Sequence, residues 1–440
     1  MTEAAPAAGG GDFDAVHDHS VVCTAHPLPP EEDPFHRPPP GFEQLPPGTV
    51  LRSRRVQVGV FGRIGLKNRA WQVQYRTADH LGAPRTSVAT LIEPRGPRRV
   101  PRPLLSYQCA IDAIAPRCFP SYALRRGARS YGAATRWELL NIGMALARGW
   151  AAVVPDHEGV SGNWGAPRES GYCTLDAIRA ARSFEPFDVA DDDPTVMWGY
   201  SGGGLATAWA AELHPEYAPE LAIAGAVLGS PVGSLRNTFL RLAGGPFGGL
   251  ALTVVAGLYR AYPEFHAFLD AHVTPRGREL LAQADSLSTV EALARFRNFD
   301  PADLLDMPLA DFMAGAPVRD MFADIEPGTR APSCPVLVLQ GVPDPVISIA
   351  DVDGLVEAYR DRGARIEYWR DRGAEHIALA VVSVTPSLDW LAARCVDARA
   401  TARTRTSVLA LRPGVWLGLI RHGLVVARFA VGAGVGPRGW

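Results

Sequence analysis

A serine flanked by glycines is the residue in this sequence whose surroundings most favour covalent chemistry. The motif GYSGG, centred on Ser201, follows an apolar run at 195–199 and directly precedes a helical pattern at 203–214. G-x-S-x-G between a strand and a helix is typical of a sharp turn that lifts the serine hydroxyl above a sheet. The amide of Gly202 would then donate to a developing oxyanion. A glycine-rich helix start with an N-capping serine is the alternative interpretation.

A serine hydroxyl needs a base that removes its proton and an acid that orients that base. Downstream of Ser201, Asp344 lies in PVLVLQGVPDPVIS just after an apolar run, and His376 lies in EYWRDRGAEHIALAVV between a strand pattern and a helix pattern. Serine, acid, histidine is the chain order of enzymes that use this serine turn. These residues are therefore predicted to form a catalytic triad. A turn aspartate beside Pro345 and a helix-start histidine are the alternatives.

Other ionisable residues fit the roles of catalytic base and acid less well. His157 follows an apolar run and is expected to line the site, but it precedes the serine in the chain. His214 ends a helical pattern, where a histidine interacts favourably with the helix dipole. Asp351 and Asp353 open the next helical pattern after Asp344 and are expected to cap it. Two further histidines are expected to be solvated or packed in a later segment: His266 and His272.

The elements that must position these residues alternate between apolar runs and amphipathic helical patterns. The expected strands are 87–94, 103–107, 151–156, 195–199, 222–230, 335–341 and 364–369, and the expected helices include 135–149, 174–184, 203–214 and 352–363. Nearly continuous apolar strands separated by helices predict an α/β fold, with a mostly parallel sheet covered by helices on both faces. The carboxyl ends of such strands meet at one edge, where active sites of these folds lie.

The chain divides into four predicted parts. Residues 1–33 are rich in Ala, Gly, Pro and acids and predict a disordered leader. Residues 34–230 and 331–397 form the α/β core. The interval 231–330 is too long for a structureless loop and predicts a helical cap or lid over the active-site edge. Residues 398–440 form a C-terminal extension of unknown role.

Composition excludes several classes of protein. Formal net charge is −2, and the 44 Lys+Arg residues are scattered among acids, so no nucleic-acid partner is expected. The first residues lack the basic and apolar regions of a signal peptide, which predicts a cytoplasmic protein. An apolar stretch at 413–435 is interrupted by Arg421, His422 and Arg428, so it does not predict a membrane span. A packed or loose tail is favoured there, and a segment lying on a membrane surface is the alternative.

Several segments of the chain resemble the secretory lipase family, the yeast lipase A type. They lie between Asp33 and Asp397 and include DPFHRPPPGFEQLPPGTVLRSR, CFPSYALRRG, VVPDHEGVSGNWGAPRESGYCTLDAIRAAR, WGYSGGGLATAWAAELHPEYAPEL and GVPDPVIS with AEHIALA. The resemblance implies an α/β-hydrolase core with a helical lid, activity on acylglycerols or other fatty-acid esters, and the triad named above. It also implies that Asp112 contributes to the oxyanion hole opposite Gly202. Family members are usually secreted.

The expected reaction is acyl transfer from a lipid or other ester to water through an acyl-enzyme, with no cofactor and no metal. Contact with a lipid interface, if any, is expected to be transient. The alternatives are a short-chain esterase, an acyltransferase or a peptidase on the same fold, and a non-catalytic binding protein.

Overall fold

The computed structural model describes residues 16–21, 26–397, 399 and 401–437. Its centre is an eleven-stranded sheet with the order β1-β2-β5-β6-β8-β7-β9-β10-β11-β12-β13. The pairs β2–β5, β5–β6 and β6–β8 are antiparallel, and the other neighbours are parallel. The strands are β1 (Val16–Val21), β2 (Val50–Arg55), β5 (Ala70–Ala78), β6 (Pro84–Ile92), β7 (Leu104–Gln108), β8 (Ala151–Pro155), β9 (Thr195–Tyr200), β10 (Ile223–Gly229), β11 (Val336–Gly341), β12 (Ile366–Asp371) and β13 (Arg403–Ser407). A separate two-stranded sheet joins β3 (Gly59–Val60) to β4 (Ile64–Gly65).

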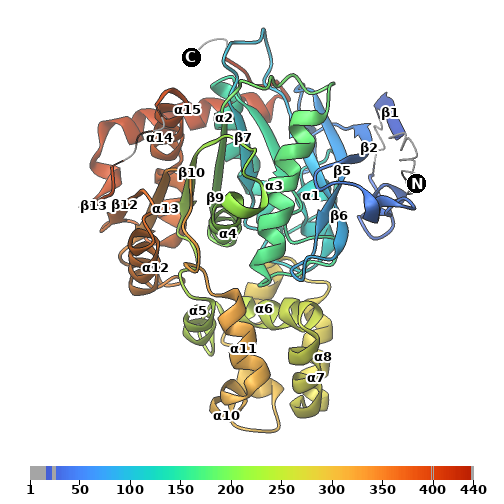
Figure 1. Ribbon diagram of the computed structural model, residues 1–440, viewed down its shortest axis with the longest axis vertical. Helices are drawn as coiled ribbons and strands as arrows, with labels where there is room; N and C mark the ends of the chain where they lie inside the picture. Colours follow the sequence, from blue (N-terminus) through green and yellow to red (C-terminus); the bar gives the residue numbers. More distant parts are fainter. Residues whose placement is uncertain (1–15, 22–25, 398, 400, 438–440) are drawn as a thin grey trace, which may run out of the picture.

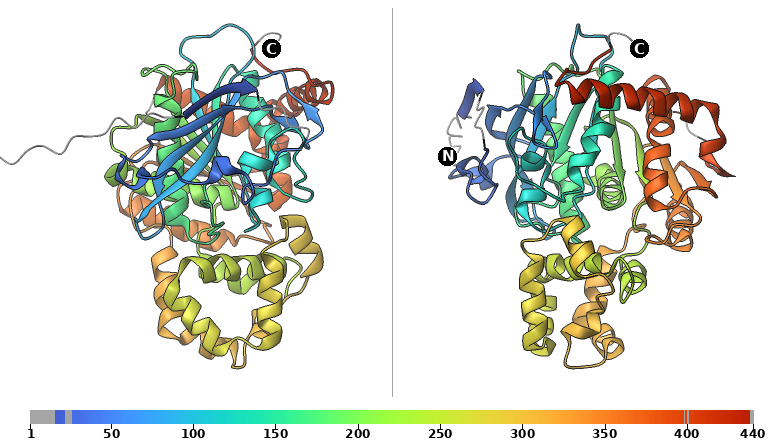
Figure 2. Two further views of the ribbon diagram at one scale, coloured as in Figure 1. Left: turned by 90° about the vertical axis from the view of Figure 1, so that its right-hand side faces the viewer. Right: turned by 180° about the vertical axis from the view of Figure 1, so that it is seen from behind.

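Helices cover both faces of the sheet (Figures 1 and 2). One face carries α3 (Pro167–Ser183), α4 (Gly202–Tyr217) and α12 (Ile349–Asp361), and the other carries α2 (Thr135–Ala147), α13 (His376–Val382), α14 (Val384–Val396) and α15 (Pro413–Ala430). Successive strand residues serve opposite faces: Leu104 packs with the first set of helices and Leu105 with the second. This explains the continuous apolar runs, and the predicted α/β fold is confirmed.

The interval between β10 and β11 is helical, and it forms a lobe beneath the sheet in Figure 1, here called the cap. Its helices are α5 (Leu235–Leu242), α6 (Gly248–Ala261), α7 (Pro263–His272), α8 (Pro275–Ala284), α9 (Thr289–Arg295), α10 (Leu309–Ala314) and α11 (Ala316–Ile325). The cap has its own apolar interior, which is continuous with the core on the α3 and α4 face.

Described parts of both terminal segments form regular structure that joins the core. Within the leader, 16–21 form strand β1 beside β2, while 1–15 and 22–25 lie outside the described residues. In the C-terminal extension, β13 adds a parallel strand to β12, and α15 packs against α2 and α14.

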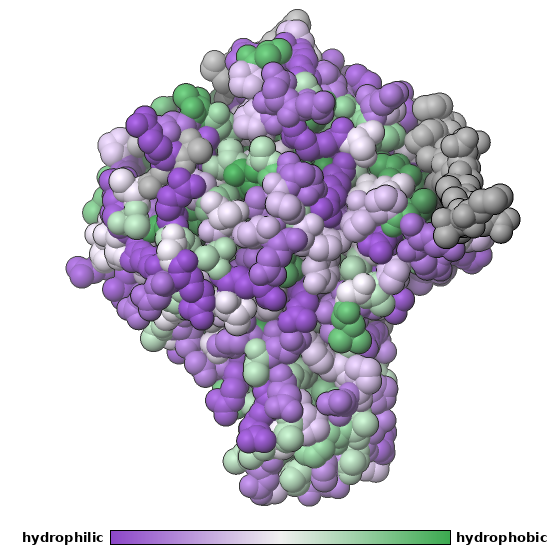
Figure 3. All heavy atoms as spheres, in the orientation of Figure 1, coloured by the Kyte–Doolittle hydropathy of each residue, from purple (hydrophilic) through white to green (hydrophobic). Residues whose placement is uncertain are grey.

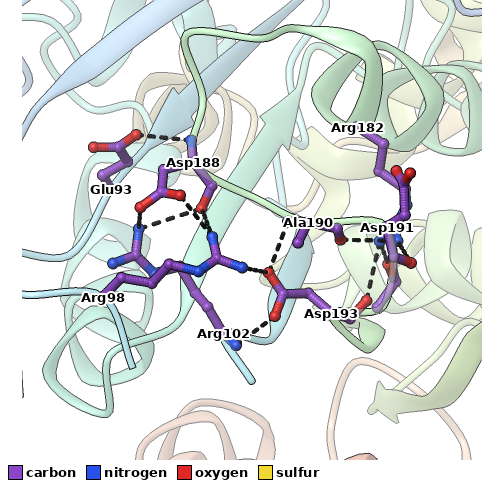
Figure 4. A network of polar contacts seen from close by, with 9 residues as sticks. Glu93, Arg98, Arg102, Arg182, Asp188, Ala190, Asp191 and Asp193 are labelled. Carbon is purple, nitrogen blue, oxygen red and sulfur yellow. Dashed lines mark hydrogen bonds and ion pairs between the residues drawn. The ribbon is translucent and has the colours of Figure 1, made fainter. Parts of the chain in front are cut away.

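An ion-pair network joins the segments that precede two neighbouring strands of the sheet (Figure 4). Arg98 bonds Asp188 and Asp193 at 2.6 Å each, and Arg102 bonds Asp188 at 2.9 Å. The amide of Arg102 also donates to Asp193 at 2.6 Å. These contacts join the segment before β7 to the segment before β9, so they hold the two neighbouring strands in register.

Most large apolar side chains are buried, and the surface is mainly hydrophilic. On the face shown in Figure 3, hydrophilic residues predominate and hydrophobic ones form small, separate groups. Over the described residues, no single helix has the length and hydropathy to cross a bilayer, although α13 and α14, bent by 50°, meet the criterion as a pair. Much of α14 is a core helix, with Leu388 and Leu391 fully buried.

Candidate active site

Ser201 stands at the bend between β9 and α4. Its backbone has φ 55° and ψ −119°, a conformation that L-residues rarely adopt. A Cβ on Gly199 would lie 2.1 Å from the carbonyl oxygen of Gly203, and a Cβ on Gly203 would lie 2.0 Å from that of Gln108. Positions 199 and 203, on either side of Ser201, therefore accept only glycine, and this allows so sharp a turn.

The imidazole of His376 links the serine to an aspartate. Its Nε2 lies 3.0 Å from the Ser201 Oγ, and its Nδ1 lies 2.7 Å from the Asp344 Oδ2. His376 and Asp344 are 5% and 3% exposed, so these bonds are sheltered from water. The structure thus brings together three side chains from the carboxyl ends of β9, β11 and β12.

Several groups keep the Asp344 carboxylate in place. Its Oδ1 accepts from the amides of Val346 at 2.8 Å and Ile347 at 2.9 Å, and its Oδ2 also accepts from the Gln340 side chain at 3.1 Å. Burial alone would raise the pKa of Asp344, but the hydrogen bond and charge of His376 and these amides hold it below its usual value. The group therefore remains an anion that can orient an imidazole.

Asp112 lies opposite Gly202. It follows β7 and has φ 46°, and a Cβ on Gly202 would lie 2.2 Å from its Oδ1. Burial raises the pKa of Asp112 to about 6, against a lowering effect of His376. The Asp112 Oδ1 is buried and has no hydrogen-bond partner among the described residues. The carboxyl group therefore faces the space beside Ser201.

The loop that carries Asp112 is held by side chains from three other segments. His157 Nε2 lies 2.7 Å from the carbonyl oxygen of Cys109, and the amide of Ala110 donates to Glu138 at 2.7 Å. Thr289, at the start of α9 in the cap, donates to the carbonyl oxygen of Ile111 at 3.0 Å. Sequence reasoning missed Glu138 and Thr289, because neither belongs to a motif.

His157 is not among the residues that line the cavity beside Ser201, and it is not placed to act as a base there. It is buried, and burial lowers its pKa to about 4. The ring is therefore neutral near pH 7, and its Nε2–H donates to Cys109. The role of His157 is to fix the loop that precedes Asp112.

The other ionisable residues considered from the sequence form contacts outside the Ser201 site. His214 bonds the Ser333 hydroxyl at 2.8 Å and the Leu221 carbonyl oxygen at 2.7 Å. Ser348, and neither Asp351 nor Asp353, caps α12, so that expectation was wrong. Both carboxylates bond side chains instead: Asp351 accepts from Asn237 and Asp353 from Tyr368. Both cap histidines lie near acids in the cap: His266 beside Asp270 and His272 beside Asp306.

A narrow cavity of about 40 Å³ opens beside Ser201. Apart from Asp112 and Thr238 its other side chains are apolar, and they include Trp164, Leu205, Phe239 and Val254. A second cavity of about 20 Å³ lies within the cap, has wholly apolar side chains and shares Phe239 and Val254 with the first. The Ser201 hydroxyl therefore adjoins apolar space that continues towards the interior of the cap.

Among the described residues, no group of three or more His, Cys, Asp or Glu is placed to hold a metal ion. The five described cysteines are free: Cys109, Cys118, Cys173 and Cys334 are buried, and Cys395 is half-buried.

Comparisons with known proteins agree with this architecture. A family model described as secretory lipase matches residues 124–402. Lipase A of Arthroderma benhamiae is 34% identical over 434 residues, covering 94% of this chain and 90% of the relative. A protein of Mycobacterium tuberculosis named as a probable inactive lipase is 45% identical over 410 residues, covering 92% of each chain.

The solved structure of Candida antarctica lipase A in its closed state superposes with a TM-score of 0.83 at 27% identity. It covers 94% of this chain and 99% of the other. The core is therefore an α/β-hydrolase fold, and the chain belongs to the secretory lipase family.

Proposed function

We propose that this protein hydrolyses acylglycerols or other fatty-acid esters, with Ser201 as nucleophile, His376 as general base and Asp344 as the orienting acid. The observation that carries the proposal is the unbroken hydrogen-bonded chain from Ser201 through His376 to Asp344. Apolar space beside the serine favours a substrate with an acyl chain.

The reaction follows from this arrangement. His376 removes the Ser201 proton while the oxygen attacks the ester carbonyl carbon, and the imidazolium is stabilised by Asp344. The amides of Gly202 and Asp112 donate to the oxyanion, helped by the N-terminus of α4. His376 then protonates the leaving alcohol, and water activated by the same imidazole releases the acid. In this proposal the cap, 231–330, acts as a lid that shields the acyl chain from water.

A non-catalytic protein is the second candidate, because the relative of 45% identity is named as a probable inactive lipase. A fluorophosphonate probe separates the two candidates, since it reacts only with an activated serine. We expect labelling of the wild-type protein and none of Ser201→Ala. An unlabelled wild-type protein would favour the second candidate.

The substrate class needs a separate measurement. Hydrolysis of p-nitrophenyl esters from butyrate to palmitate distinguishes a lipase-like preference from that of a short-chain esterase. Peptide substrates and alcohol acceptors, assayed in parallel, test the peptidase and acyltransferase alternatives.

A further inference from the structure

The C-terminal helix α15 is docked on the core by one face only. Val425 and Phe429 pack so closely on Gly143 of α2 that a Cβ there would lie 2.9 Å and 2.7 Å from them. Gly418 is equally close to Thr385 of α14. Gly143 lets α15 approach α2, and Gly418 lets it approach α14. Together these two close contacts fix the rotation of α15 about its own axis.

The opposite face of α15 presents large apolar side chains to solvent. Trp416, Leu417, Ile420 and Leu424 are 59%, 50%, 64% and 51% exposed. Three of them recur at intervals of four residues, so they form one stripe along the helix. A helix on the surface of a globular protein normally carries polar residues there.

Basic residues without acidic partners border this stripe. The extension 398–440 contains seven arginines and no Asp or Glu, although the whole chain has a net charge of −2. Arg403 is neutralised by Glu367, whereas Arg421 and Arg428 are exposed and form no ion pair within the described part of the chain. The exposed face of α15 is therefore both apolar and positively charged.

A second segment extends the same surface. The loop between β6 and β7 presents Val100, which is 74% exposed, and Arg99, which donates to the carbonyl oxygen of Pro437 at 3.2 Å. This bond places the loop beside the segment that follows α15. Arg98 and Arg102 of the same loop are instead engaged by Asp188 and Asp193 (Figure 4).

We propose that the exposed face of α15, together with Arg99 and Val100, docks on an anionic lipid surface. Trp, Leu and Ile side chains enter the boundary between headgroups and acyl chains, and arginines bind headgroup phosphates. A second copy of this chain fits less well, because two such faces would bring arginines against arginines. In Figures 1 and 2, α15 lies at the end of the molecule away from the cap, so docking leaves the cap clear of the bilayer.

Flotation of the full-length protein with vesicles tests this proposal. All proteins carry Ser201→Ala so that the lipid stays intact, and the result is independent of the proposed hydrolysis. We expect binding to vesicles of phosphatidylglycerol and phosphatidylcholine, and little binding to phosphatidylcholine alone. Raising the salt to 0.5 M should weaken binding, since it screens the arginines, with a Debye length of about 4 Å.

Two double variants identify the face. Trp416→Ser with Ile420→Ser, and Arg421→Gln with Arg428→Gln, should each lower the partition coefficient by about tenfold or more. These side chains are exposed, although Trp416 Nε1 donates to the carbonyl oxygen of Ala410 at 2.8 Å, so the melting temperatures should fall only slightly.

The matched control is Leu81→Ser with Val160→Ser, two exposed apolar residues that line a surface hollow beside the cap. It should bind as tightly as the parent protein. Loss of binding in this control alone would overturn the proposal, and so would equal binding to neutral and anionic vesicles. A dimer that dissociates on Trp416→Ser, without vesicle binding, would show that a second copy covers this face.

Discussion

Thr289 of the cap donates a 3.0 Å hydrogen bond to the carbonyl oxygen of Ile111, the residue directly before Asp112. The bond is buried and joins segments 178 residues apart. Beside it, Arg117 bonds the carbonyl oxygen of Ser286 at 2.7 Å, and the amide of Val290 donates to Gly132 at 3.1 Å. The start of α9 is therefore attached to the core segment that carries the proposed oxyanion loop.

This attachment predicts that Thr289 positions the loop during catalysis. Thr289→Val removes the hydroxyl and leaves the Ile111 carbonyl without that partner, which costs about 1–2 kcal/mol. We expect kcat on a p-nitrophenyl ester to fall about tenfold with KM nearly unchanged, because the oxyanion amide acts mainly in the transition state. Thr289→Ser should restore most of the activity.

Thr253→Val is the matched control. Thr253 is also a buried cap threonine, but its hydroxyl donates to Gly249 of its own helix at 2.9 Å. Equal losses of kcat in the two valine variants would mean that general loosening of the cap, and not the bond to Ile111, causes the effect.

The proposed triad predicts a graded series of losses. Ser201→Ala and His376→Ala each remove a reacting group and should lower kcat by about 10⁵- to 10⁶-fold. Asp344→Asn retains the shape but favours the wrong imidazole tautomer, and a loss of about 10⁴-fold is expected. Gln340→Met, which removes only one donor to Asp344, should cost much less. Steady-state kinetics on one ester measures all four, and retained activity in Ser201→Ala would exclude the nucleophile proposed here.

Local and long-range features differ in how well the sequence predicts them. The bend at Ser201 was predictable because its glycines are adjacent in the chain. Strand β5 was missed because its polar alternate residues are also buried: Gln72 accepts from Arg54 at 2.7 Å, and Gln74 donates to Arg37 at 3.2 Å. A polar residue at a buried position is recognisable only when its partner, about 20 to 40 residues away, is known.

The support around the proposed oxyanion loop was unpredictable for the same reason. Glu138 occupies an exposed-looking position in a helical pattern, yet it is half-buried and its carboxylate accepts from the amide of Ala110. The partners of the loop are supplied by α2 and α9, and no short-range spacing relates them to Asp112. Family resemblance, and not periodicity, is what suggested a role for Asp112 in the oxyanion hole.

Asp112 predicts a specific pH dependence. Its pKa of about 6 lies above the usual value for an aspartate, so the carboxyl is neutral below about pH 6 and charged above it. The neutral form can donate a hydrogen bond towards an oxyanion, whereas the charged form repels it. Asp112→Asn keeps a donor at every pH. We therefore expect the ratio of variant to wild-type kcat to rise as pH increases through about 6, by roughly tenfold between pH 5 and pH 8. A constant ratio would show that the carboxyl does not face the oxyanion.

Buried acids predict that stability falls as pH rises above neutrality. Burial raises the pKa of Glu138 and Glu169 to about 8 and that of Asp156 to about 7. Between pH 6.5 and 8.5 the folded protein retains protons on these groups that the unfolded chain has released, so unfolding becomes easier as pH increases. The melting temperature should therefore be lower at pH 8.5 than at pH 6.5. Glu138→Gln, which can still accept from Ala110, should reduce this slope, and an unchanged slope would argue against a protonated Glu138.

Val254 and Phe239 lie between the cavity beside Ser201 and the second cavity inside the cap. If acyl chains extend from one to the other, a larger side chain at Val254 should shorten the accepted chain. Val254→Phe is expected to lower kcat/KM for the palmitate ester at least about tenfold and to change that for the butyrate ester less than threefold, since a short chain ends before this point. Overpacking also costs about 1–3 kcal/mol of stability, so the butyrate rate serves as the internal check for folding. Equal losses on both esters would place the acyl chain on another path out of the site.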